Sequence, residues 1–307
     1  MTKVLVATEK PFAPVAVDGI RKIIVEAGFE LILLENYTTT AEFVAAVKDA
    51  DAVIVRSDIL SKEVIDAAEK LKIAIRAGAG YDNLDLPACT AKGIVAMNTP
   101  GQNSNAVAEL VYGLLVYHIR KNFSGKSGSE LRGKKLGIHA YGAVGRYVGL
   151  IAKGFGMDVY AFDPFIPAEK IEADGVHALS SVEELYKSCQ IISLHIPANA
   201  QTKKSINYEL LSTMPKGAIL VNTARKEVIE EEGLLKLMAE RKDFSYLSDI
   251  EPDAKQQFVE NFSGRFVFTA KKSGAQTEEA NINAGLAAAN QIVNFIKNGD
   301  KTFQLNK

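Results

Sequence analysis

The sequence predicts an α/β protein with two doubly wound, parallel-sheet domains. The chain has 307 residues, which is more than one hydrophobic core usually serves. Short runs rich in β-branched residues alternate with longer amphipathic segments. One loop rich in glycine, serine and lysine interrupts this alternation and divides it into two series. Each series therefore predicts strands joined by helical crossovers, which parallel sheets require.

The first series contains five runs that we expect to be strands: Val4–Ala7, Leu31–Leu34, Val53–Val55, Ile73–Ile75 and Ile94–Met97. The second series contains six: Leu136–His139, Val159–Phe162, Ile191–Leu194, Ile219–Val221, Leu247–Ile250 and Phe266–Thr269. Because both series alternate in the same way, we expect one doubly wound sheet in each half of the chain.

The boundary between the halves is predicted near the turn at 98–101. A helical pattern over 103–120 and the polar loop 122–132 follow this turn. An alanine-rich helical pattern over 278–297 follows the last strand of the second series, and we expect it to return and pack on the first half. The predicted domains are therefore a discontinuous one, 1–98 plus 278–307, and an inserted one, 99–277.

Composition excludes several classes of partner. Lys and Arg total 36 against 37 for Asp and Glu, so the net charge of -1 favours a small anionic ligand over nucleic acid. Cys89 and Cys189 form no CxxC motif, and we expect neither a disulfide framework nor a metal site. The apolar run 106–117 is too short to span a membrane, and the N-terminus lacks the pattern of a secretory signal. We therefore expect a cytoplasmic protein without a membrane partner.

A glycine turn follows the first strand of the second series. The sequence there is Ala140-Tyr141-Gly142-Ala143-Val144-Gly145, and a helical pattern over 146–155 comes next. This is a GxGxxG motif whose first glycine is replaced by Ala140. The motif brings backbone N–H groups and a helix N-terminus close to a pyrophosphate, and Gly142 and Gly145 suit that purpose. The replacement is tolerable if its position does not demand a positive φ.

Asp163 ends the next predicted strand, eighteen residues after Gly145. A carboxylate at this place accepts hydrogen bonds from the adenosine ribose and repels a 2′-phosphate, so the pair predicts NAD as the cofactor. The alternative is that the glycines only permit a tight turn and that Asp163 caps a loop.

Several longer motifs resemble one family, the D-isomer-specific 2-hydroxyacid dehydrogenases, and the resemblance covers nearly the whole chain. In the first half the motifs are Arg76-Ala77-Gly78-Ala79-Gly80-Tyr81-Asp82-Asn83-Leu84-Asp85, Asn98-Thr99-Pro100-Gly101-Gln102-Asn103-Ser104 and Val107-Ala108-Glu109. In the second half they are Leu194-His195-Ile196-Pro197, Val221-Asn222-Thr223-Ala224-Arg225, Ser248-Asp249-Ile250-Glu251-Pro252 and Gly274-Ala275-Gln276-Thr277.

The resemblance implies a Rossmann NAD domain inserted in a flavodoxin-like substrate domain, catalysis in the cleft between them, and a homodimer formed through the helix after Pro100. Within the family the chain looks similar to the short phosphoglycerate dehydrogenases that lack a C-terminal regulatory domain. Because it ends at Lys307, we expect no such domain. The implied oxidoreductase reaction is NAD-dependent oxidation of 3-phosphoglycerate to 3-phosphohydroxypyruvate, in serine biosynthesis.

Three residues form the expected catalytic set. The planar guanidinium of Arg225 suits a carboxylate, although pairing with Glu227 is the alternative. Most family members carry Pro-His-Ile-Gly where this chain has 269–274, and counting back from Gly274 places Lys272 at the histidine. This resembles a lysine-bearing subgroup of the phosphoglycerate dehydrogenases. Glu251 precedes Pro252, as the family's catalytic glutamate does.

Proton transfer by lysine requires a lowered pKa. The ordinary lysine pKa, about 10.4, is poor for accepting a proton at neutral pH, so burial or a neighbouring cation such as Lys271 or Arg225 must lower it. We expect Glu251 to act in the opposite direction while orienting the lysine. Keto-acid reduction near pH 7 and hydroxy-acid oxidation at alkaline pH follow. Lys271 as the proton-transfer residue, or both lysines as solvated loop charges, are the alternatives.

The remaining expected cofactor residues are Asp249 at the nicotinamide carboxamide, with a structural cap as its alternative, and the wall of His195, Ile196, Pro197, Thr202, Thr223, Ala224 and Gly274. His195 is not expected to be the catalytic base. The other histidines, His118, His139 and His177, are interpreted as packing residues.

Substrate binding is expected from the first half. The backbone N–H groups of Ala77 and Gly78 should face an oxyanion, with Asn83 and Asn103 supporting their loop. Arg56 and Ser57 end a strand and offer charge and a hydroxyl for a phosphate, unless Arg56 forms only a surface ion pair.

Two other functions remain open. A glyoxylate or hydroxypyruvate reductase, or another D-2-hydroxyacid dehydrogenase, would share the fold and cofactor. A non-catalytic NAD-sensing module would explain the missing histidine and the alanine in the glycine turn.

Overall fold

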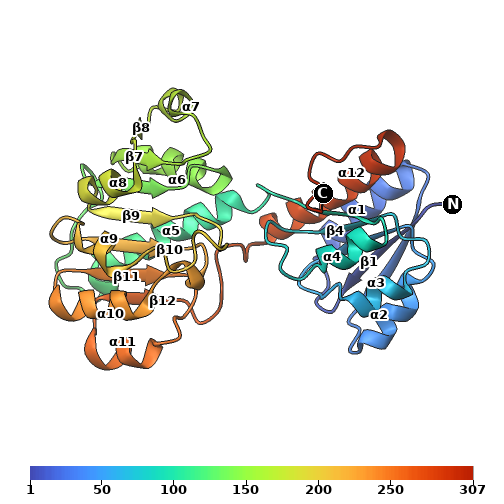
Figure 1. Cartoon of the computed structure of the whole chain (residues 1–307), viewed down its shortest axis with the longest axis horizontal. Helices are drawn as coiled ribbons and strands as arrows, with labels where there is room; N and C mark the ends of the chain where they lie inside the picture. Colours follow the sequence, from blue (N-terminus) through green and yellow to red (C-terminus); the bar gives the residue numbers. More distant parts are fainter. Residues whose placement is uncertain (307) are drawn as a thin grey trace. The chain divides into compact units, whose positions relative to one another are not determined.

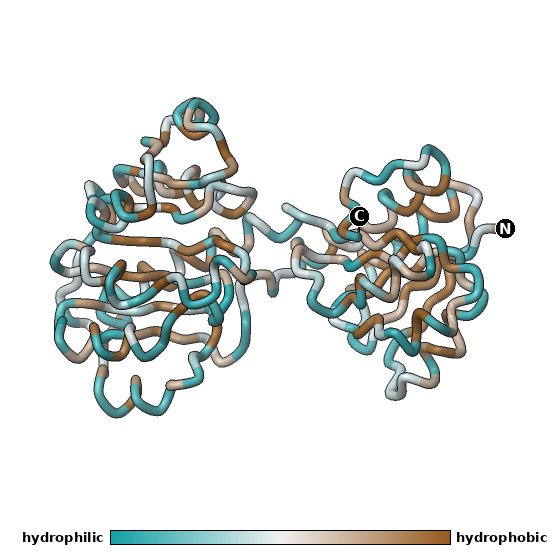
Figure 2. Tube along the Cα trace, viewed as in Figure 1, coloured by the Kyte–Doolittle hydropathy of each residue, from teal (hydrophilic) through white to brown (hydrophobic). Residues whose placement is uncertain are grey.

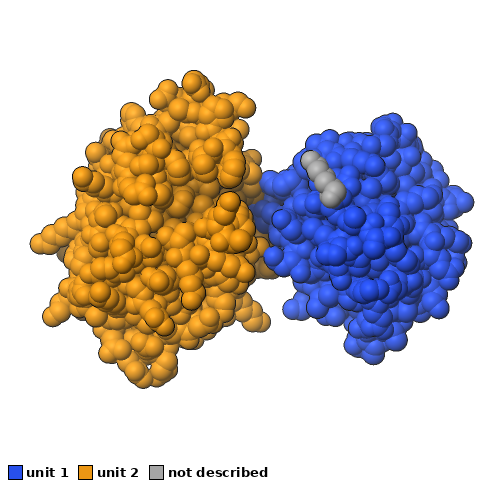
Figure 3. Space-filling view, viewed as in Figure 1, with its two compact units in different colours: residues 1–103, 277–307 blue, residues 104–276 orange. Residues whose placement is uncertain are grey.

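The computed structural model describes residues 1–306 and divides into two compact units. Unit 1 comprises residues 1–103 and the C-terminal segment from Thr277, and unit 2 comprises residues 104–276 (Figure 3). The first unit is therefore discontinuous in sequence, and the second is inserted into it. Each unit has its own sheet and its own hydrophobic core (Figure 1).

Unit 1 is built on a five-stranded parallel sheet in the order β2-β1-β3-β4-β5. Its strands are β1 (Lys3–Thr8), β2 (Glu30–Glu35), β3 (Ala52–Val55), β4 (Ile73–Arg76) and β5 (Val95–Asn98). Its helices are α1 (Pro14–Glu26), α2 (Thr40–Val47), α3 (Lys62–Ala67), α4 (Leu86–Ala91) and α12 (Glu278–Asn298). Helices α1 and α12 share one hydrophobic cluster on one face of the sheet, and α2, α3 and α4 share another on the opposite face.

The C-terminal tail covers the edge strand of this sheet. Gln304 forms an antiparallel bridge with Met97, and the Leu305 N–H donates to the Ala96 carbonyl. The buried Asn306 side chain accepts from the Ala96 N–H at 2.8 Å and donates to the Ile94 carbonyl at 2.8 Å. These bonds satisfy backbone groups that an open edge would leave unpaired.

Unit 2 is built on a seven-stranded parallel sheet in the order β12-β11-β10-β9-β6-β7-β8. Its strands are β6 (Lys135–His139), β7 (Asp158–Phe162), β8 (His177–Ala178), β9 (Ile191–Leu194), β10 (Ile219–Asn222), β11 (Ser245–Ser248) and β12 (Phe266–Phe268). Its helices are α5 (Ser104–Ile119), α6 (Ala143–Gly154), α7 (Ala168–Ala173), α8 (Val182–Ser188), α9 (Tyr208–Ser212), α10 (Glu231–Glu240) and α11 (Lys255–Asn261), with 3-10 turns at Lys121–Phe123 and Lys226–Val228.

Two apolar clusters cover the two faces of the seven-stranded sheet. Helices α5, α6 and α7 contribute to one cluster, and α8, α9, α10 and α11 contribute to the other. The strands form the hydrophobic interior of each unit in Figure 2, with polar segments around them. The direction of chain winding reverses between β6 and β9, which is where open α/β sheets place a ligand.

The prediction of two parallel-sheet α/β domains is confirmed, and the differences are local. The short edge strand β8 was not predicted, and His177, expected to be a packing residue, lies exposed on it. Strand β11 ends at Ser248 rather than Ile250, because the Ser248 hydroxyl accepts from the Ile250 N–H and turns the chain. Helix α6 begins at Ala143, three residues earlier than predicted.

Helices that could cross a lipid bilayer are absent from residues 1–306, since none combines the necessary length and apolarity.

Candidate active site

The expected cofactor and catalytic residues of unit 2 lie on loops at one edge of its sheet. These loops follow the carboxyl ends of β6, β7, β9, β10, β11 and β12. Because all seven strands are parallel, the six loops meet on the same side of the sheet. The sheet thereby gathers residues from segments up to 134 positions apart, from Ala140 to Gly274.

The glycine turn forms the N-terminus of α6. Gly142 is the N-cap of the helix, and Gly142 and Ala143 are both exposed, so the first free N–H groups of the helix are open to an anion. A Cβ on Gly142 would meet no atom within 4 Å, which leaves space for a ligand. A Cβ on Gly145 would meet the Ala140 carbonyl oxygen at 2.4 Å. Glycine at 145 therefore allows α6 to pack close to β6.

Ala140 occupies a left-handed backbone conformation, with φ of 78°. The condition under which alanine would be tolerable at the first turn position, the absence of a positive φ, is not met. The position demands the conformation that glycine adopts without penalty, and the chain places a Cβ there. The turn keeps its geometry because its neighbours hold it: the Ala140 N–H donates to the Phe162 carbonyl at 2.9 Å.

Asp163 fixes the same turn from the end of β7. One carboxylate oxygen accepts from the Tyr141 N–H and the other from the Phe165 N–H, both at 2.8 Å. Asp163 thus caps its own loop and also anchors the glycine turn, while each oxygen retains acceptor capacity for a ribose hydroxyl. The Tyr141 side chain is 1% exposed and points away into the unit, so this residue offers its backbone.

The loop after β9 is closed by its own polar groups. The Thr202 hydroxyl donates to the Pro197 carbonyl and accepts from the Asn199 N–H at 2.9 Å. Ile196 is buried in the core and Pro197 is exposed. This loop can therefore supply a preformed wall for a cofactor, with the apolar Ile196 side chain as its anchor.

Two histidines lie beneath the glycine turn at the β6–β9 border. The His195 N–H donates to the His139 carbonyl at 2.9 Å, the His195 ring contacts the Ser193 hydroxyl at 2.9 Å, and the His139 ring contacts the Tyr186 hydroxyl at 3.2 Å. Burial lowers the pKa of His139 to about 4 and that of His195 to about 3. Both rings are therefore neutral near pH 7, and a pKa of about 3 makes His195 a weak proton acceptor.

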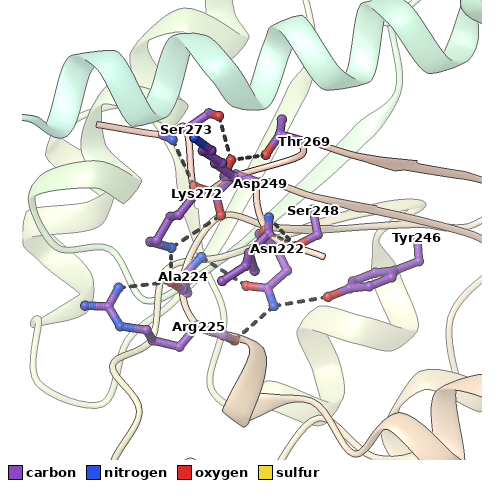
Figure 4. A network of polar contacts seen from close by, with 12 residues as sticks. Asn222, Ala224, Arg225, Tyr246, Ser248, Asp249, Thr269, Lys272 and Ser273 are labelled. Atoms are coloured by element: carbon purple, nitrogen blue, oxygen red, sulfur yellow. Dashed lines mark hydrogen bonds and ion pairs between the residues drawn. The ribbon is translucent and has the colours of Figure 1, made fainter. Parts of the chain in front are cut away.

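The turn after β10 is shaped by the fully buried Asn222. Its side chain accepts from the Ala224 N–H at 3.0 Å and donates to the Arg225 carbonyl at 3.0 Å and to the Tyr246 hydroxyl at 3.2 Å (Figure 4). The turn presents Thr223, whose buried hydroxyl has no partner among the described residues. An unsatisfied hydroxyl at this edge fits a cofactor that supplies the missing hydrogen bond.

Lys272 and Arg225 meet at this turn. The Lys272 ammonium donates to the Ala224 carbonyl at 2.7 Å, and the Arg225 guanidinium donates to the same oxygen at 3.1 Å. Figure 4 shows both side chains converging on Ala224 from different loops. Arg225 lies three residues beyond the end of β10, in the N-cap of a 3-10 turn, rather than at the strand end itself.

Asp249 is the carboxylate that contacts Lys272. One Asp249 oxygen lies 3.3 Å from the Lys272 ammonium, and the other accepts from the Gly274 N–H at 3.0 Å. The Asp249 side chain is 1% exposed, whereas that of Lys272 is 40% exposed. A Cβ on Gly274 would lie 2.7 Å from the Asp249 carboxylate, so this glycine permits the contact. The two Asp249 oxygens thus already contact Lys272 and Gly274, and these contacts compete with the expected one to the cofactor.

The pKa of Lys272 is lowered from its usual value of 10.5. Desolvation of the ammonium is the main cause, and the nearby Arg225 charge adds to it, whereas Asp249 acts in the opposite direction. Of the two expected causes, burial or a neighbouring cation, desolvation is the larger here, and Arg225 is the cation that adds to it.

Glu251 and Lys271 lie apart from this contact. Glu251 forms an ion pair with Lys255 at 2.6 Å within its own segment, so the carboxylate on Lys272 is that of Asp249 and not the expected Glu251. The Lys271 carbonyl accepts from the hydroxyls of Thr269 and Ser273, both at 2.7 Å. These two bonds curl the loop and direct the adjacent Lys272 toward the site.

The substrate residues expected in unit 1 follow β3 and β4. Arg56 donates to the carbonyls of Lys10 and Pro11 and to Asn281 at 2.8 Å, so its guanidinium is largely engaged within the unit. Ser57 is exposed. The Asn83 amide donates to the Asp58 carbonyl at 2.7 Å and so supports the Arg56–Asp58 loop.

The backbone groups of the glycine-rich loop after β4 differ from expectation. The Ala77 N–H donates to the Val55 carbonyl at 2.8 Å, as a continuation of the sheet, and is not open to an oxyanion. The Gly78 N–H has no acceptor among the described residues. Asn103 lies at the end of unit 1, immediately before α5.

Sequence reasoning missed two residues of this region. The Arg76 guanidinium occupies the space beside Gly78, where a Cβ would lie 1.6 Å from an Arg76 nitrogen, so Gly78 is required and Arg76 is a second arginine at the strand ends. The buried Asp58 accepts from the Glu9 N–H at 2.6 Å and from the Tyr37 hydroxyl at 2.9 Å and ties three strand ends together. The position of Arg76 at the end of a β-branched run could have indicated it.

Groups of histidine, cysteine or acidic residues that could hold a metal ion are absent from the part of the chain that is described.

Unit 2 therefore combines a glycine turn at a helix N-terminus, an acidic residue after the next strand, and two cations at the same sheet edge. This combination defines a dinucleotide-binding domain of the dehydrogenase class. Residues 116–262 match the family described as D-isomer specific 2-hydroxyacid dehydrogenase, NAD binding domain.

Comparison with known proteins supports the same assignment. A crystal structure of NAD+-bound 3-phosphoglycerate dehydrogenase from Entamoeba histolytica is 50% identical, with a TM-score of 0.89 over 100% of this chain and 99% of that one. The D-3-phosphoglycerate dehydrogenases of Methanocaldococcus jannaschii and Homo sapiens are 35% and 33% identical over 97% and 93% of this chain. The chain spans 58% and 56% of those two relatives. It belongs to the D-isomer specific 2-hydroxyacid dehydrogenase family.

Proposed function

We propose that the protein catalyses the NAD-dependent oxidation of 3-phosphoglycerate to 3-phosphohydroxypyruvate, with Arg225 binding the carboxylate and Lys272 transferring the proton. The observation that carries the proposal is the placement of Lys272 and Arg225 on one carbonyl oxygen, at the sheet edge that holds the glycine turn. The names of the similar proteins support the choice of substrate.

The cofactor fits the residues at this edge. The N–H groups at Gly142 and Ala143 would hold the pyrophosphate, Asp163 the adenosine ribose, and the Thr223 hydroxyl a polar group of the nicotinamide end. Bound NAD supplies the nicotinamide carbon that takes or returns the hydride. The carboxylate of Asp163 also disfavours the 2′-phosphate of NADP by charge repulsion.

The chain's own residues perform the remaining steps. Arg225 binds the substrate carboxylate and places the hydroxyl-bearing carbon near Lys272. For oxidation, the neutral Lys272 amine accepts the hydroxyl proton as the C–H electron pair leaves with the hydride. For reduction, the Lys272 ammonium returns the proton to the developing alkoxide. Desolvation of the ammonium and the Arg225 charge lower the pKa of Lys272, which favours the neutral amine that oxidation requires.

Glu251 has an indirect part in this scheme. Because it pairs with Lys255 and not with Lys272, we place its effect on the loop after β11 rather than on the proton itself. Asp249 takes the orienting part, since it holds the Lys272 ammonium and the Gly274 N–H simultaneously.

Groups of unit 1 would select a phosphorylated substrate. Arg76, the Gly78 N–H, Arg56 and Ser57 lie at the carboxyl ends of neighbouring strands in unit 1 and would bind the phosphate. The engagement of Arg56 by two carbonyls and Asn281 favours the second candidate, a reductase of unphosphorylated glyoxylate or hydroxypyruvate.

A substrate panel with purified protein distinguishes these functions. We expect NADH oxidation with 3-phosphohydroxypyruvate to have at least a tenfold higher kcat/KM than with hydroxypyruvate or glyoxylate. Equal or reversed values would support the second candidate. Absence of turnover with all of them, together with measurable NADH binding, would indicate an NAD-sensing module.

We expect a cytoplasmic homodimer formed through α5, where the Tyr117 ring packs at 5.2 Å on that of Phe123 from the following 3-10 turn; the two residues are 37% and 65% exposed. Light scattering on the purified protein and on Phe123→Ser measures this directly. A monomeric wild-type protein at micromolar concentration would contradict it.

A further inference from the structure

We propose that the groove between α10 and α11 is a second binding site, for a small organic or inorganic anion that carries two or more negative charges. The groove has a volume of about 600 Å³, which is within the usual range of ligand sites. It belongs entirely to unit 2 and is lined by Leu235, Lys236, Ala239, Lys242, Gln257, Asn261, Phe262 and Arg265.

The charge of the lining is one-sided. Lys236, Lys242 and Arg265 are cations, and no carboxylate is among the lining residues. Three acids adjoin lining residues in the sequence. Asp243 pairs with Arg241 at 2.6 Å, whereas Glu240 and Glu260 accept from the neutral Tyr208 hydroxyl and Gln256 amide and keep their charge. The three lining cations outnumber these two acids. The groove therefore has a local positive potential although the whole chain is nearly neutral.

Arg265 is the fixed element of the site. One nitrogen, Nη1, donates to the Met238 carbonyl at 2.7 Å and to the Arg241 carbonyl at 3.0 Å, and the guanidinium lies 4.9 Å from the centre of the Phe262 ring. Its Nε and Nη2 donate to no residue in the described part of the chain. A guanidinium held at one edge, with its other donors unused, is preorganised for an anion.

The other lining groups complement this arginine. The Lys236 ammonium lies 4.1 Å from the centre of the Tyr208 ring, and Lys242 is exposed without an ion pair within residues 1–306. Both lysines can turn toward a bound anion, while the side-chain amides of Gln257 and Asn261 can hydrogen-bond to its oxygens. Leu235 and Ala239 add apolar surface, as is usual for small-molecule sites.

The groove is distinct from the active site. Arg265 directly precedes β12, and Lys242 lies shortly before β11, so the groove is at the amino ends of these strands. Asp249 and Lys272 lie beyond the carboxyl ends of the same two strands. Strand β12 has three residues, which span roughly 10 Å. A ligand in the groove would therefore leave the loops of the cofactor edge open.

Calorimetric titration of the full chain tests the site. The probes are inorganic pyrophosphate and citrate, used separately at low ionic strength, which distinguish phosphorylated from polycarboxylate ligands. The variants are Lys236→Glu/Lys242→Glu in the groove, and Lys170→Glu/Lys187→Glu as a control with the same charge change at two exposed lysines of unit 2. Arg225→Ala removes the anion-binding cation of the proposed active site.

We expect at least one probe to bind the wild-type, control and Arg225→Ala proteins with similar affinity, and the groove variant at least tenfold more weakly. Equal affinity in the groove and control variants, loss of binding in Arg225→Ala, or no binding of either probe to the wild-type protein would overturn the proposal. Because binding is measured without turnover, failure of the proposed dehydrogenase reaction would not affect this result.

Discussion

Lys272 and Arg225 donate to the same carbonyl oxygen, that of Ala224, from 2.7 and 3.1 Å. A single backbone atom thus sets the separation of the two cations. The arginine raises the cost of charging the lysine, and the shared oxygen limits the rotation of both side chains. The turn held by Asn222 therefore determines the position of the proposed carboxylate site and that of the proton-transfer group together.

Replacement of Lys272 tests its part in proton transfer. We expect Lys272→Ala to lower kcat by roughly 10²- to 10⁴-fold, the usual contribution of general acid–base catalysis. Lys271→Ala is the matched control, because its side chain is exposed and only its backbone takes part in the loop. Steady-state NADH oxidation measures both. Similar losses in the two variants, or full activity in Lys272→Ala, would contradict the assignment.

The pH dependence should follow the lowered pKa of Lys272. Oxidation requires the neutral amine, so its kcat should rise with pH and level off below the usual lysine value of 10.5. Reduction requires the ammonium, so its kcat should fall over the same interval. A rate of oxidation that is flat between about pH 7 and 9, with the chemical step limiting, would argue against lysine as the base.

Asp249→Asn should shift that profile in a defined direction. The Asp249 carboxylate raises the pKa of Lys272, so its neutralisation should move the rise in oxidation rate to lower pH. The asparagine oxygen can still accept from the Gly274 N–H. Glu251→Gln is the comparison, and we expect its profile to stay in place because Glu251 pairs with Lys255. A larger shift in Glu251→Gln than in Asp249→Asn would restore the assignment made from sequence.

The strained turn predicts a stabilising substitution. Ala140 has φ of 78°, so Ala140→Gly should relieve strain and increase the free energy of unfolding by about 0.5–1 kcal/mol after the greater chain entropy of glycine is subtracted. Gly142→Ala should leave stability nearly unchanged, because the added Cβ meets no atom, yet weaken NADH binding. Thermal unfolding and NADH fluorescence titration separate the two effects. A lower free energy of unfolding in Ala140→Gly would contradict the inferred backbone strain at residue 140.

The histidines beneath the turn predict acid sensitivity. Their pKa values of about 4 and about 3 lie below the ordinary value of 6.5, so unfolding takes up protons as the pH falls below 6.5. At pH 5 each histidine should lower the free energy of unfolding by about 2 kcal/mol relative to neutral pH. His139→Gln should reduce this loss while retaining a contact to Tyr186. Hydrogen exchange of the β6 and β9 amides at pH 7.5 and 5 measures this loss of stability. An equal loss in His139→Gln and the wild-type protein would contradict the prediction.

The sequence predicted the strands well because β-branched runs mark buried parallel strands directly. It did not predict which carboxylate contacts Lys272. That choice depends on where β11 ends, at Ser248, where the hydroxyl accepts from the Ile250 N–H. The strand stops before Asp249, whose side chain then turns inward, while Glu251 turns toward Lys255. Because β11 ends two residues earlier than predicted, Asp249 contacts Lys272 in place of the expected Glu251.

The sequence also did not predict which backbone groups are free to bind a ligand. The motif around Ala77 and Gly78 indicated two N–H groups for an anion, but pairing with β3 uses that of Ala77. The backbone strain at Ala140 could not be predicted either, because the residue type does not reveal the sign of φ. Both depend on neighbours far along the chain, which local patterns do not specify.

The discontinuity of unit 1 has a consequence for synthesis on the ribosome. Helix α12 supplies Ala284, Ala288, Ala289 and Ile292 to the core on one face of the five-stranded sheet, and the tail through Asn306 closes its edge. These segments leave the ribosome after residues 104–276, which form the whole of unit 2. Residues 1–103 therefore expose one apolar face of their sheet until α12 has been synthesised, and exposed apolar surface of this kind favours aggregation during folding.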